Sequence, residues 1–250
     1  MTPSFIAIIP ARRGSTRLPN KPLLDIAGLP MVVRTAQQAA QSNARQVVVA
    51  TDDEEILNVV QHHGFTALLT RPDHASGTDR LAEAAQQLAL TADSIVVNVQ
   101  GDEPLIEPDL INQVAALLAK REEAHIATCA CPITSQDDLH NPNQVKVVTQ
   151  LNQLALYFSR SPLPWAQQLS QPWPDNFPAY RHIGLYAYRT EFLQQFSQLT
   201  PGVLEQFEKL EQLRALENGY QIVVQPLASA PAPGVDTEAD LERVRRRYLE

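Results

Sequence analysis

Several features are missing from this chain of 250 residues, and each absence excludes a class of protein. There are only two cysteines, Cys129 and Cys131, and they are too close in sequence for a good disulfide and have no second Cys/His pair for zinc. No apolar run approaches the ~20 residues that cross a bilayer. The first apolar run is short and leads into a cationic loop, unlike a signal peptide. We therefore expect a cytoplasmic protein in a reducing compartment, without membrane insertion.

An excess of positive charge is also absent, and so is a glycine-rich dinucleotide loop. The net charge of −8 argues against a nucleic-acid polymer as partner. No Gly-x-Gly-x-x-Gly follows the first apolar run, which speaks against a Rossmann dehydrogenase. We find no internal repeat, low-complexity tract or linker, so residues 1–250 are expected to form a single domain.

Strand-like apolar runs alternate with helical periods through the first half of the chain. The predicted strands here are those at 5–9, 46–50, 66–69, 95–99 and 125–133. Amphipathic stretches between them predict helices. This repeated βαβ rhythm indicates a mostly parallel, Rossmann-like α/β sheet with helices on both faces.

The rhythm breaks after Pro132. Later predicted strands are those at 145–149, 154–158, 182–188 and 222–227. The first two read as an antiparallel ribbon, and a single helix is expected over 204–217. We therefore predict an antiparallel arm, at about residues 133–190, inserted into the α/β domain.

A basic loop follows the first predicted strand. Pro10 is expected to end that strand, because proline cannot donate a ladder hydrogen bond. The next eleven residues hold no acid, and their cations are Arg12, Arg13, Arg17 and Lys21, with Gly14 and Ser15 among them. At the carboxyl end of a first strand this composition favours a phosphorylated ligand. A solvated surface loop is the alternative.

Two acids could hold a metal, although each also has a structural reading. Asp102 follows the strand at 95–99, where Gly-Asp is typical of a turn. Asp236 precedes the last predicted helix and could be its N-cap, beside the near capping box Thr237-x-x-Asp240. Mg²⁺ is usually bound by one or two carboxylates together with substrate phosphate oxygens. The two acids are therefore candidate Mg²⁺ ligands if they lie close together.

Three sequence strings carry a resemblance to a known family. Residues 12–22 fit Arg-x-x-Ser-Thr-Arg-Leu-Pro-x-Lys-Pro, residues 100–104 read Gln-Gly-Asp-Glu-Pro, and residues 235–241 fit Val-Asp-Thr-x-x-Asp-Leu. The chain thereby resembles the sugar nucleotidyltransferases, and among them the 3-deoxy-D-manno-octulosonate (Kdo) cytidylyltransferases. The resemblance implies transfer of CMP from CTP to Kdo for lipopolysaccharide assembly, Mg²⁺ as cofactor, and a homodimer joined through the arm.

The resemblance also implies roles for particular residues. It makes Asp102 and Asp236 the Mg²⁺ ligands, and it makes Arg12 and Lys21 catalytic together with them. The implied nucleotide-binding residues are Pro10, Arg12, Ser15, Lys21, Ser76, Gly77, Arg80 and Gln100. The implied sugar-binding residues are Arg160, His182, Tyr186, Glu211 and Gln212. The region 165–179 matches only loosely, and no site is assigned there.

Other functions stay open beside this one. A sialic-acid cytidylyltransferase runs the same chemistry on another 2-keto acid sugar, but its first loop typically reads Arg-x-x-Ser-Lys. A nucleotide sensor without catalysis would not need the intact acid pair. Taken singly, Arg160 is equally a surface residue, His182 a hydrogen-bonded strand histidine, and Glu211 part of a solvated helix face.

Overall fold

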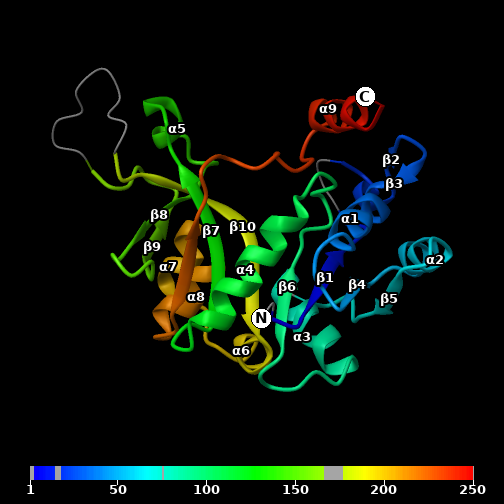
Figure 1. Ribbon diagram of the computed structural model, residues 1–250, viewed down its shortest axis with the longest axis horizontal. Coiled ribbons are helices and arrows are strands. Elements are labelled where there is room, and N and C mark those ends of the chain that lie inside the picture. Colours follow the sequence, from blue (N-terminus) through cyan, green and yellow to red (C-terminus); the bar gives the residue numbers. More distant parts are fainter. Residues whose placement is uncertain (1–2, 15–17, 75, 166–176, 250) are drawn as a thin grey trace.

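The computed structural model describes residues 3–14, 18–74, 76–165 and 177–249 (Figure 1). Its main strands are β1 (Phe5–Ala11), β4 (Gln46–Thr51), β5 (Thr66–Leu69), β6 (Ile95–Asn98), β7 (Ile126–Pro132), β8 (Lys146–Thr149), β9 (Ala155–Ser159), β10 (Tyr180–Arg189) and β11 (Ile222–Pro226). A separate small hairpin pairs β2 (Asp25–Ile26) with β3 (Leu29–Pro30). The helices are α1 (Met31–Ala39), α2 (Glu54–His62), α3 (Gly77–Gln87), α4 (Pro108–Lys120), α5 (Gln136–His140), α6 (Thr190–Phe196), α7 (Val203–Glu208), α8 (Gln212–Glu217) and α9 (Glu238–Leu249), with a 3₁₀ turn, η1, at Lys21–Leu23.

One sheet organises the molecule. Its order is β11-β7-β10-β6-β1-β4-β5, and the ribbon of β8 and β9 is attached beside β10. The pairs along this path are parallel except for those of β10, which runs antiparallel to both β6 and β7. The predicted fold class, a mostly parallel α/β sheet with an inserted antiparallel part, is confirmed.

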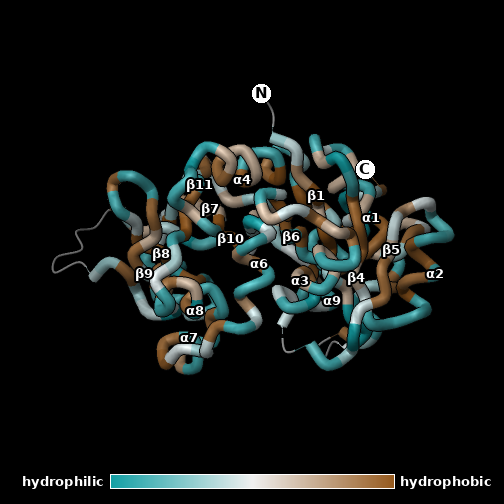
Figure 2. The backbone as a smooth tube through the Cα atoms, turned by 90° about the horizontal axis from the view of Figure 1, so that it is seen from below, coloured by the Kyte–Doolittle hydropathy of each residue, from teal (hydrophilic) through white to brown (hydrophobic). Residues whose placement is uncertain are grey.

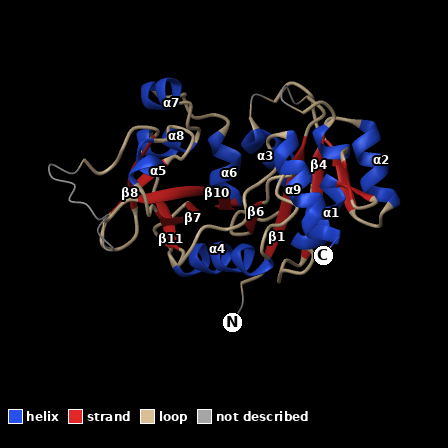
Figure 3. Ribbon diagram, turned by 90° about the horizontal axis from the view of Figure 1, so that it is seen from above, coloured by secondary structure: helices blue, strands red, loops and turns tan. Residues whose placement is uncertain are grey.

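Helices cover both faces of this sheet (Figure 3). Side chains alternate across a strand, so Ala7 and Ile9 of β1 pack in a core with α1, α2 and α4, whereas Ile6 and Ile8 pack in a second core with α3, α6 and α8. β1 runs through the interior as a hydrophobic stretch, while the loops around it are mostly hydrophilic (Figure 2). Among the described residues, no helix is long and apolar enough to cross a membrane.

The first strand does not end at Pro10, as the sequence predicted, but continues to Ala11. The reason lies in its neighbours. β6 pairs with β1 from Phe5 as far as Ile8 and no further. The Ile8 carbonyl accepts a hydrogen bond from Val99 N at 3.0 Å. Pro10 lies two residues on and therefore faces the same side, beyond the end of β6, so its missing N–H removes no ladder bond.

The predicted helix over 204–217 is two helices, because Lys209 adopts a left-handed conformation with φ of 55°. In α7 no residue is buried, and Phe207 is 85% exposed, whereas Leu210 and Leu213 beyond the break lie in the core. The carboxylate of Glu217 in α8 accepts hydrogen bonds from the backbone at the start of α7. The two short helices thus fold back on each other instead of forming one rod.

Within the predicted arm, the ribbon of β8 and β9 is attached beside the main path of the sheet, whereas β10 passes through the sheet's middle. β8 pairs with the first two residues of β10, Tyr180 and Arg181. The two cysteines, Cys129 and Cys131 of β7, are free thiols buried on one face.

Candidate active site

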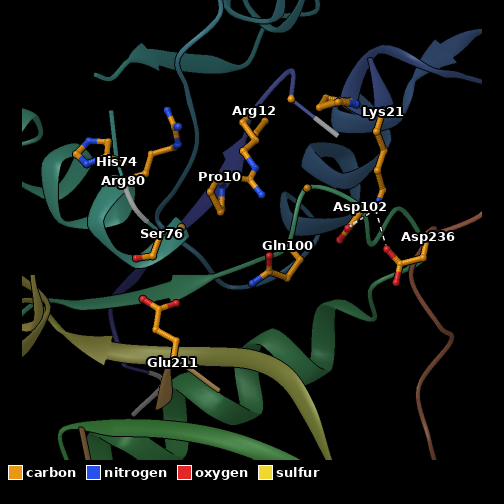
Figure 4. Close-up of a pocket in the computed structure, with 15 residues that line it drawn as sticks. Pro10, Arg12, Lys21, His74, Ser76, Arg80, Gln100, Asp102, Glu211 and Asp236 are labelled. Carbon is orange, nitrogen blue, oxygen red and sulfur yellow. Dashed lines mark hydrogen bonds and ion pairs between the residues drawn. The ribbon is translucent and has the colours of Figure 1, made fainter. Parts of the chain in front are cut away.

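A cavity of about 550 Å³ opens at the carboxyl ends of β1 and β6 (Figure 4). Its lining residues are Pro10, Ala11, Arg12, Gly14, Lys21, Pro22, His74, Ser76, Gly77, Arg80, Gln100, Gly101, Asp102, Glu211 and Asp236. These come from the loop after β1, the start of α3, the loop after β6, α8's entrance and the segment before α9. The fold therefore brings together every predicted nucleotide-binding and catalytic residue that it describes. Ser15 lies outside the described residues.

The cations of the first loop do not all face this cavity. Arg12 points into it (Figure 4), and Lys21 reaches it from η1. Arg13 turns away and pairs with Asp53 at 3.2 Å and with Glu55 at 2.8 Å, at the start of α2. Arg17 lies outside the described residues. Since phosphate recognition needs cations in the cavity, Arg12 and Lys21 are the described members of the loop that can contribute.

At one end of the cavity, Lys21 bridges the two acids. Its Nζ lies 2.5 Å from Asp102 Oδ2 and 3.2 Å from Asp236 Oδ1 (Figure 4). The backbone joins the acid-bearing segments as well, because Val235 N donates to Asp102 O at 2.9 Å. Gly234 permits this approach, since a Cβ there would stand only 3.1 Å from that same oxygen.

This acid pair suits a magnesium ion. Asp102 and Asp236 already converge on one cation, the ammonium of Lys21, and both offer the hard oxygens that Mg²⁺ prefers. The described residues hold no cluster of three or more His, Cys, Asp or Glu side chains fit for a metal. Two carboxylates would leave the other positions to water and substrate phosphates, which is the usual composition of a nucleotide-bound Mg²⁺ site.

Asp236 is not the helix cap that the sequence allowed. The hydrogen bonds at the start of α9 belong to Thr237 and Asp240: Asp240 N donates to Thr237 Oγ1 at 3.2 Å, and Thr237 N donates to Asp240 Oδ2 at 2.9 Å. Asp240 also accepts from Asp236 N at 3.2 Å. The capping box therefore lies one residue further on, and the Asp236 carboxylate is directed to Lys21.

The start of α3 forms the opposite wall. Ser76 is the N-cap, in a complete capping box with Asp79. Arg80 is buried, and its guanidinium donates to Asp52 Oδ2 at 2.8 Å and to Thr70 Oγ1 at 2.5 Å. Arg80 is thus fixed in the wall, and its charge is already paired with Asp52. These contacts favour a role as a rigid surface against a nucleotide base over a role as a phosphate-binding cation.

His74 also lines the cavity, although no role was predicted for it from the sequence. It begins the string His-Ala-Ser-Gly-Thr-Asp-Arg at residues 74–80, which contains the predicted residues Ser76, Gly77 and Arg80. His74 Nε2 makes a short hydrogen bond with Glu83, and Arg71 N donates to the same carboxylate at 3.0 Å. Burial opposes ionisation of Glu83, but hydrogen bonds from Arg71, His74 and Gln87 together outweigh it and lower its pKa. Its place in this string was the only sequence feature that could have pointed to His74, because its contact is with Glu83, nine residues later.

A second cavity, of about 160 Å³, adjoins the first and shares Gly77, Gln100 and Glu211 with it. Its lining residues are Gly77, Thr78, Asn98, Gln100, Ile126, Tyr186, Tyr188, Phe196, Glu211 and Gln212. Burial raises the pKa of Glu211, and Glu211 Oε1 and Asn98 Oδ1 are buried without a hydrogen-bond partner among the described residues. Two acceptors against an aromatic wall suit a ligand that carries hydroxyl groups.

Two predicted sugar-binding residues do not line either cavity. Arg160 donates from Nε to Glu208 O at 2.8 Å and from a terminal nitrogen to Pro142 O at 3.0 Å, so it ties β9 to α7 and to the loop before β8. His182 lies behind Tyr186, at 5.3 Å between ring centroids. Their roles toward a sugar stay predictions.

His182 should make stability depend on pH. Its ring is enclosed by Phe158 and Tyr186, and burial lowers its pKa from 6.5 to about 3. Between these values the unfolded chain binds a proton that the folded chain does not, so stability falls as pH falls, by at most about 1.4 kcal/mol per pH unit. Urea unfolding between about pH 7 and about pH 4 should give a shallower pH slope for His182→Gln. The same change at exposed His62 should leave the slope unaltered; equal slopes for His182→Gln and the unmodified chain would contradict the prediction.

Known proteins match both the sequence and the shape of this chain. The sequence model of the family described as Cytidylyltransferase matches residues 6–222. A solved structure of CMP:2-keto-3-deoxy-manno-octonic acid synthetase complexed with CTP is 42% identical, and the match covers 99% of this chain and 99% of that chain with a TM-score of 0.91.

Two more distant structures share the fold alone. A cytidylyltransferase from Leptospira borgpetersenii serovar Hardjo-bovis is 16% identical, with a TM-score of 0.62 over 97% of this chain and 84% of that chain. A protein described as a glucose-1-phosphate thymidylyltransferase from Bacillus anthracis, in complex with a sucrose, is also 16% identical, with a TM-score of 0.65 over 98% of this chain and 95% of that chain.

Proposed function

This chain belongs to the cytidylyltransferase family, and from that premise we propose that it transfers CMP from CTP to Kdo, releasing pyrophosphate. The observation that carries the proposal is the 42% identity, over 99% of both chains, to a CMP:2-keto-3-deoxy-manno-octonic acid synthetase complexed with CTP. The product would activate Kdo for lipopolysaccharide assembly. A sialic-acid cytidylyltransferase is not favoured, because neither that relative nor the first loop points to it.

The cavities suit the two substrates of this reaction. The larger one, of about 550 Å³, runs from the wall at Ser76 and Arg80 to the acid pair, and this length suits a nucleotide with its base at the wall and its phosphates at Lys21. The smaller one adjoins it at Gln100 and Glu211, and its buried acceptors suit sugar hydroxyls. The acceptor would thus lie beside the α-phosphate.

We propose an in-line displacement in which the anomeric hydroxyl of the sugar attacks the α-phosphorus and pyrophosphate leaves on the opposite side. Arg12 and Lys21 would hold the phosphates and offset their charge, while Gln100 and Glu211 would hold the acceptor at the reacting atom. Asp102 and Asp236 would hold Mg²⁺. When bound, Mg²⁺ supplies positive charge to the phosphate oxygens and makes a nearby hydroxyl more acidic.

We further propose that residues 1–250 form a single domain that works as a homodimer in the cytoplasm. Exposed apolar side chains near the ribbon support an interface there; they are Leu156, Trp165, Val203, Leu204 and Phe207. Two free thiols support a reducing compartment.

A pyrophosphate-release assay tests the function directly. Each of CTP, UTP, ATP and GTP is offered with Mg²⁺ and with Kdo or a sialic acid as acceptor. We expect release with CTP and Kdo, and loss of it on chelation of the metal. Faster release with the sialic acid, or with another nucleotide, would overturn the assignment of substrate while leaving the family unchanged.

A further inference from the structure

The C-terminal helix α9 lies beside the β2–β3 hairpin (Figure 1), and its buried side chains pack on residues close in sequence to the site. Leu241 and Val244 of this helix form a small apolar cluster, separate from the two main cores. That cluster contains Leu18, Leu105 and Val235. Each of these three residues is close in sequence to a group at the polar end of the cavity: Leu18 to Lys21, Leu105 to Asp102 and Val235 to Asp236.

Tyr248, at the end of α9, makes the most direct connection. Its hydroxyl donates to Pro104 O at 2.6 Å, two residues after Asp102. The guanidinium of Arg34 lies over its ring, 4.5 Å from the centroid. Arg34 in turn donates to Ile26 O at 3.0 Å and to Ala27 O at 2.6 Å, in the β2–β3 hairpin. Tyr248 is therefore held at its ring face as well as through its hydroxyl.

The carbonyl that Tyr248 binds belongs to the loop that also contacts the second acid segment. Val235 N donates to Asp102 O, and Gly234 fits closely against the same loop. A shift of the loop at Pro104 would move Asp102 and, through Val235, disturb Asp236. Carboxylates that share one ion need positions fixed to a fraction of an ångström.

We propose that Tyr248 is a positioning residue for the acid pair: its hydroxyl, acting through the Pro104 carbonyl, keeps Asp102 and Asp236 convergent on one divalent cation. This inference rests on the proposed function, in which the two acids hold Mg²⁺. Arg34 supports the same arrangement by fixing the tyrosine ring.

Tyr248→Phe tests the inference, because it removes the hydroxyl and keeps the ring under Arg34. Mn²⁺ serves as the probe, and free Mn²⁺ is measured by its EPR signal with and without CTP. A net hydrogen bond is worth about 0.5–1.5 kcal/mol, so Mn²⁺ should bind roughly 2- to 12-fold more weakly. The Michaelis constant for Kdo should stay unchanged, because no sugar contact is altered.

Tyr220→Phe is the matched control. Tyr220 also donates its hydroxyl to one partner, Gln195 Oε1 at 3.1 Å, but away from the cavity. It should reproduce any general loss of thermal stability while leaving Mn²⁺ affinity alone. Wild-type Mn²⁺ affinity in Tyr248→Phe, or an equal loss in Tyr220→Phe, overturns the inference. A wild-type chain that binds no Mn²⁺ overturns it together with the metal assignment, and this pattern is distinct from the other two.

Discussion

Replacing Lys21 by alanine is expected to lower turnover about 10²-fold or more, the scale for losing one group that stabilises charge in a transition state. Lys21 is mostly enclosed, with its side chain 12% exposed, and its ammonium already lies at the polar end of the cavity. Developing charge on the phosphates would therefore meet a cation that needs little rearrangement. Steady-state pyrophosphate release at saturating CTP and Kdo measures the effect.

The control for this change is Lys120→Ala, which removes a lysine from the exposed end of α4. It changes the net charge by the same amount and should keep full turnover. A thermal melt shows whether Lys21→Ala remains folded, since the substitution also leaves Asp102 and Asp236 without their shared cation. Full turnover in a folded Lys21→Ala chain would remove the residue from the chemistry.

The sheet was predictable because its signals are local. β1, β4 and β6 are short, nearly continuous apolar runs, as expected of parallel strands buried on both faces. The stripes of α1 and α4 show which sides face the core. These patterns were enough for the fold class, since alternating strands and helices leave few arrangements.

The place of β10 could not be predicted in the same way. Its run of residues looks like that of any half-buried strand, yet it lies antiparallel between β6 and β7. That position depends on pairing across long stretches of chain, which no local pattern records. The break at Lys209 also coincides with contacts between distant segments, since Glu208 beside it binds Ser159 of β9 and the backbone of Arg160 just after that strand.

The candidate site divides along similar lines. Strings of fixed spacing place Arg12, Lys21, Gln100 and Asp102 in the segments that follow β1 and β6, and the parallel sheet brings these segments together. Tyr248 gave no such signal, because its role depends on one hydrogen bond to a carbonyl 144 residues away. Arg160 shows a second limit of sequence strings. The string suggested that it contacts the sugar, but its guanidinium donates to the backbone carbonyls of Glu208 and Pro142, which are distant in sequence.

Asp236 shows how a local pattern and a distant contact can compete. The pattern before α9 allowed a capping role, and the helix does begin with a capping box, but that box is made by Thr237 and Asp240. What distinguishes Asp236 is a contact with Lys21, 215 positions earlier in the chain. Because Asp236 does not cap α9, a substitution there tests the metal role without removing the cap.

Asp236→Asn is expected to lower the rate of pyrophosphate release about 10²-fold or more, while leaving the melting temperature nearly unchanged. The cap of α9 stays in place, because Thr237 and Asp240 make it, but asparagine lacks the negative charge that a hard Mg²⁺ prefers. Asp102→Asn should behave alike, and the double variant should lose little more than either single one, because ligands of one ion act as a unit. Asp93→Asn, at an exposed turn before β6, controls for lost charge and should stay active. Near-full activity of a folded Asp236→Asn chain would mean that Asp236 holds no metal.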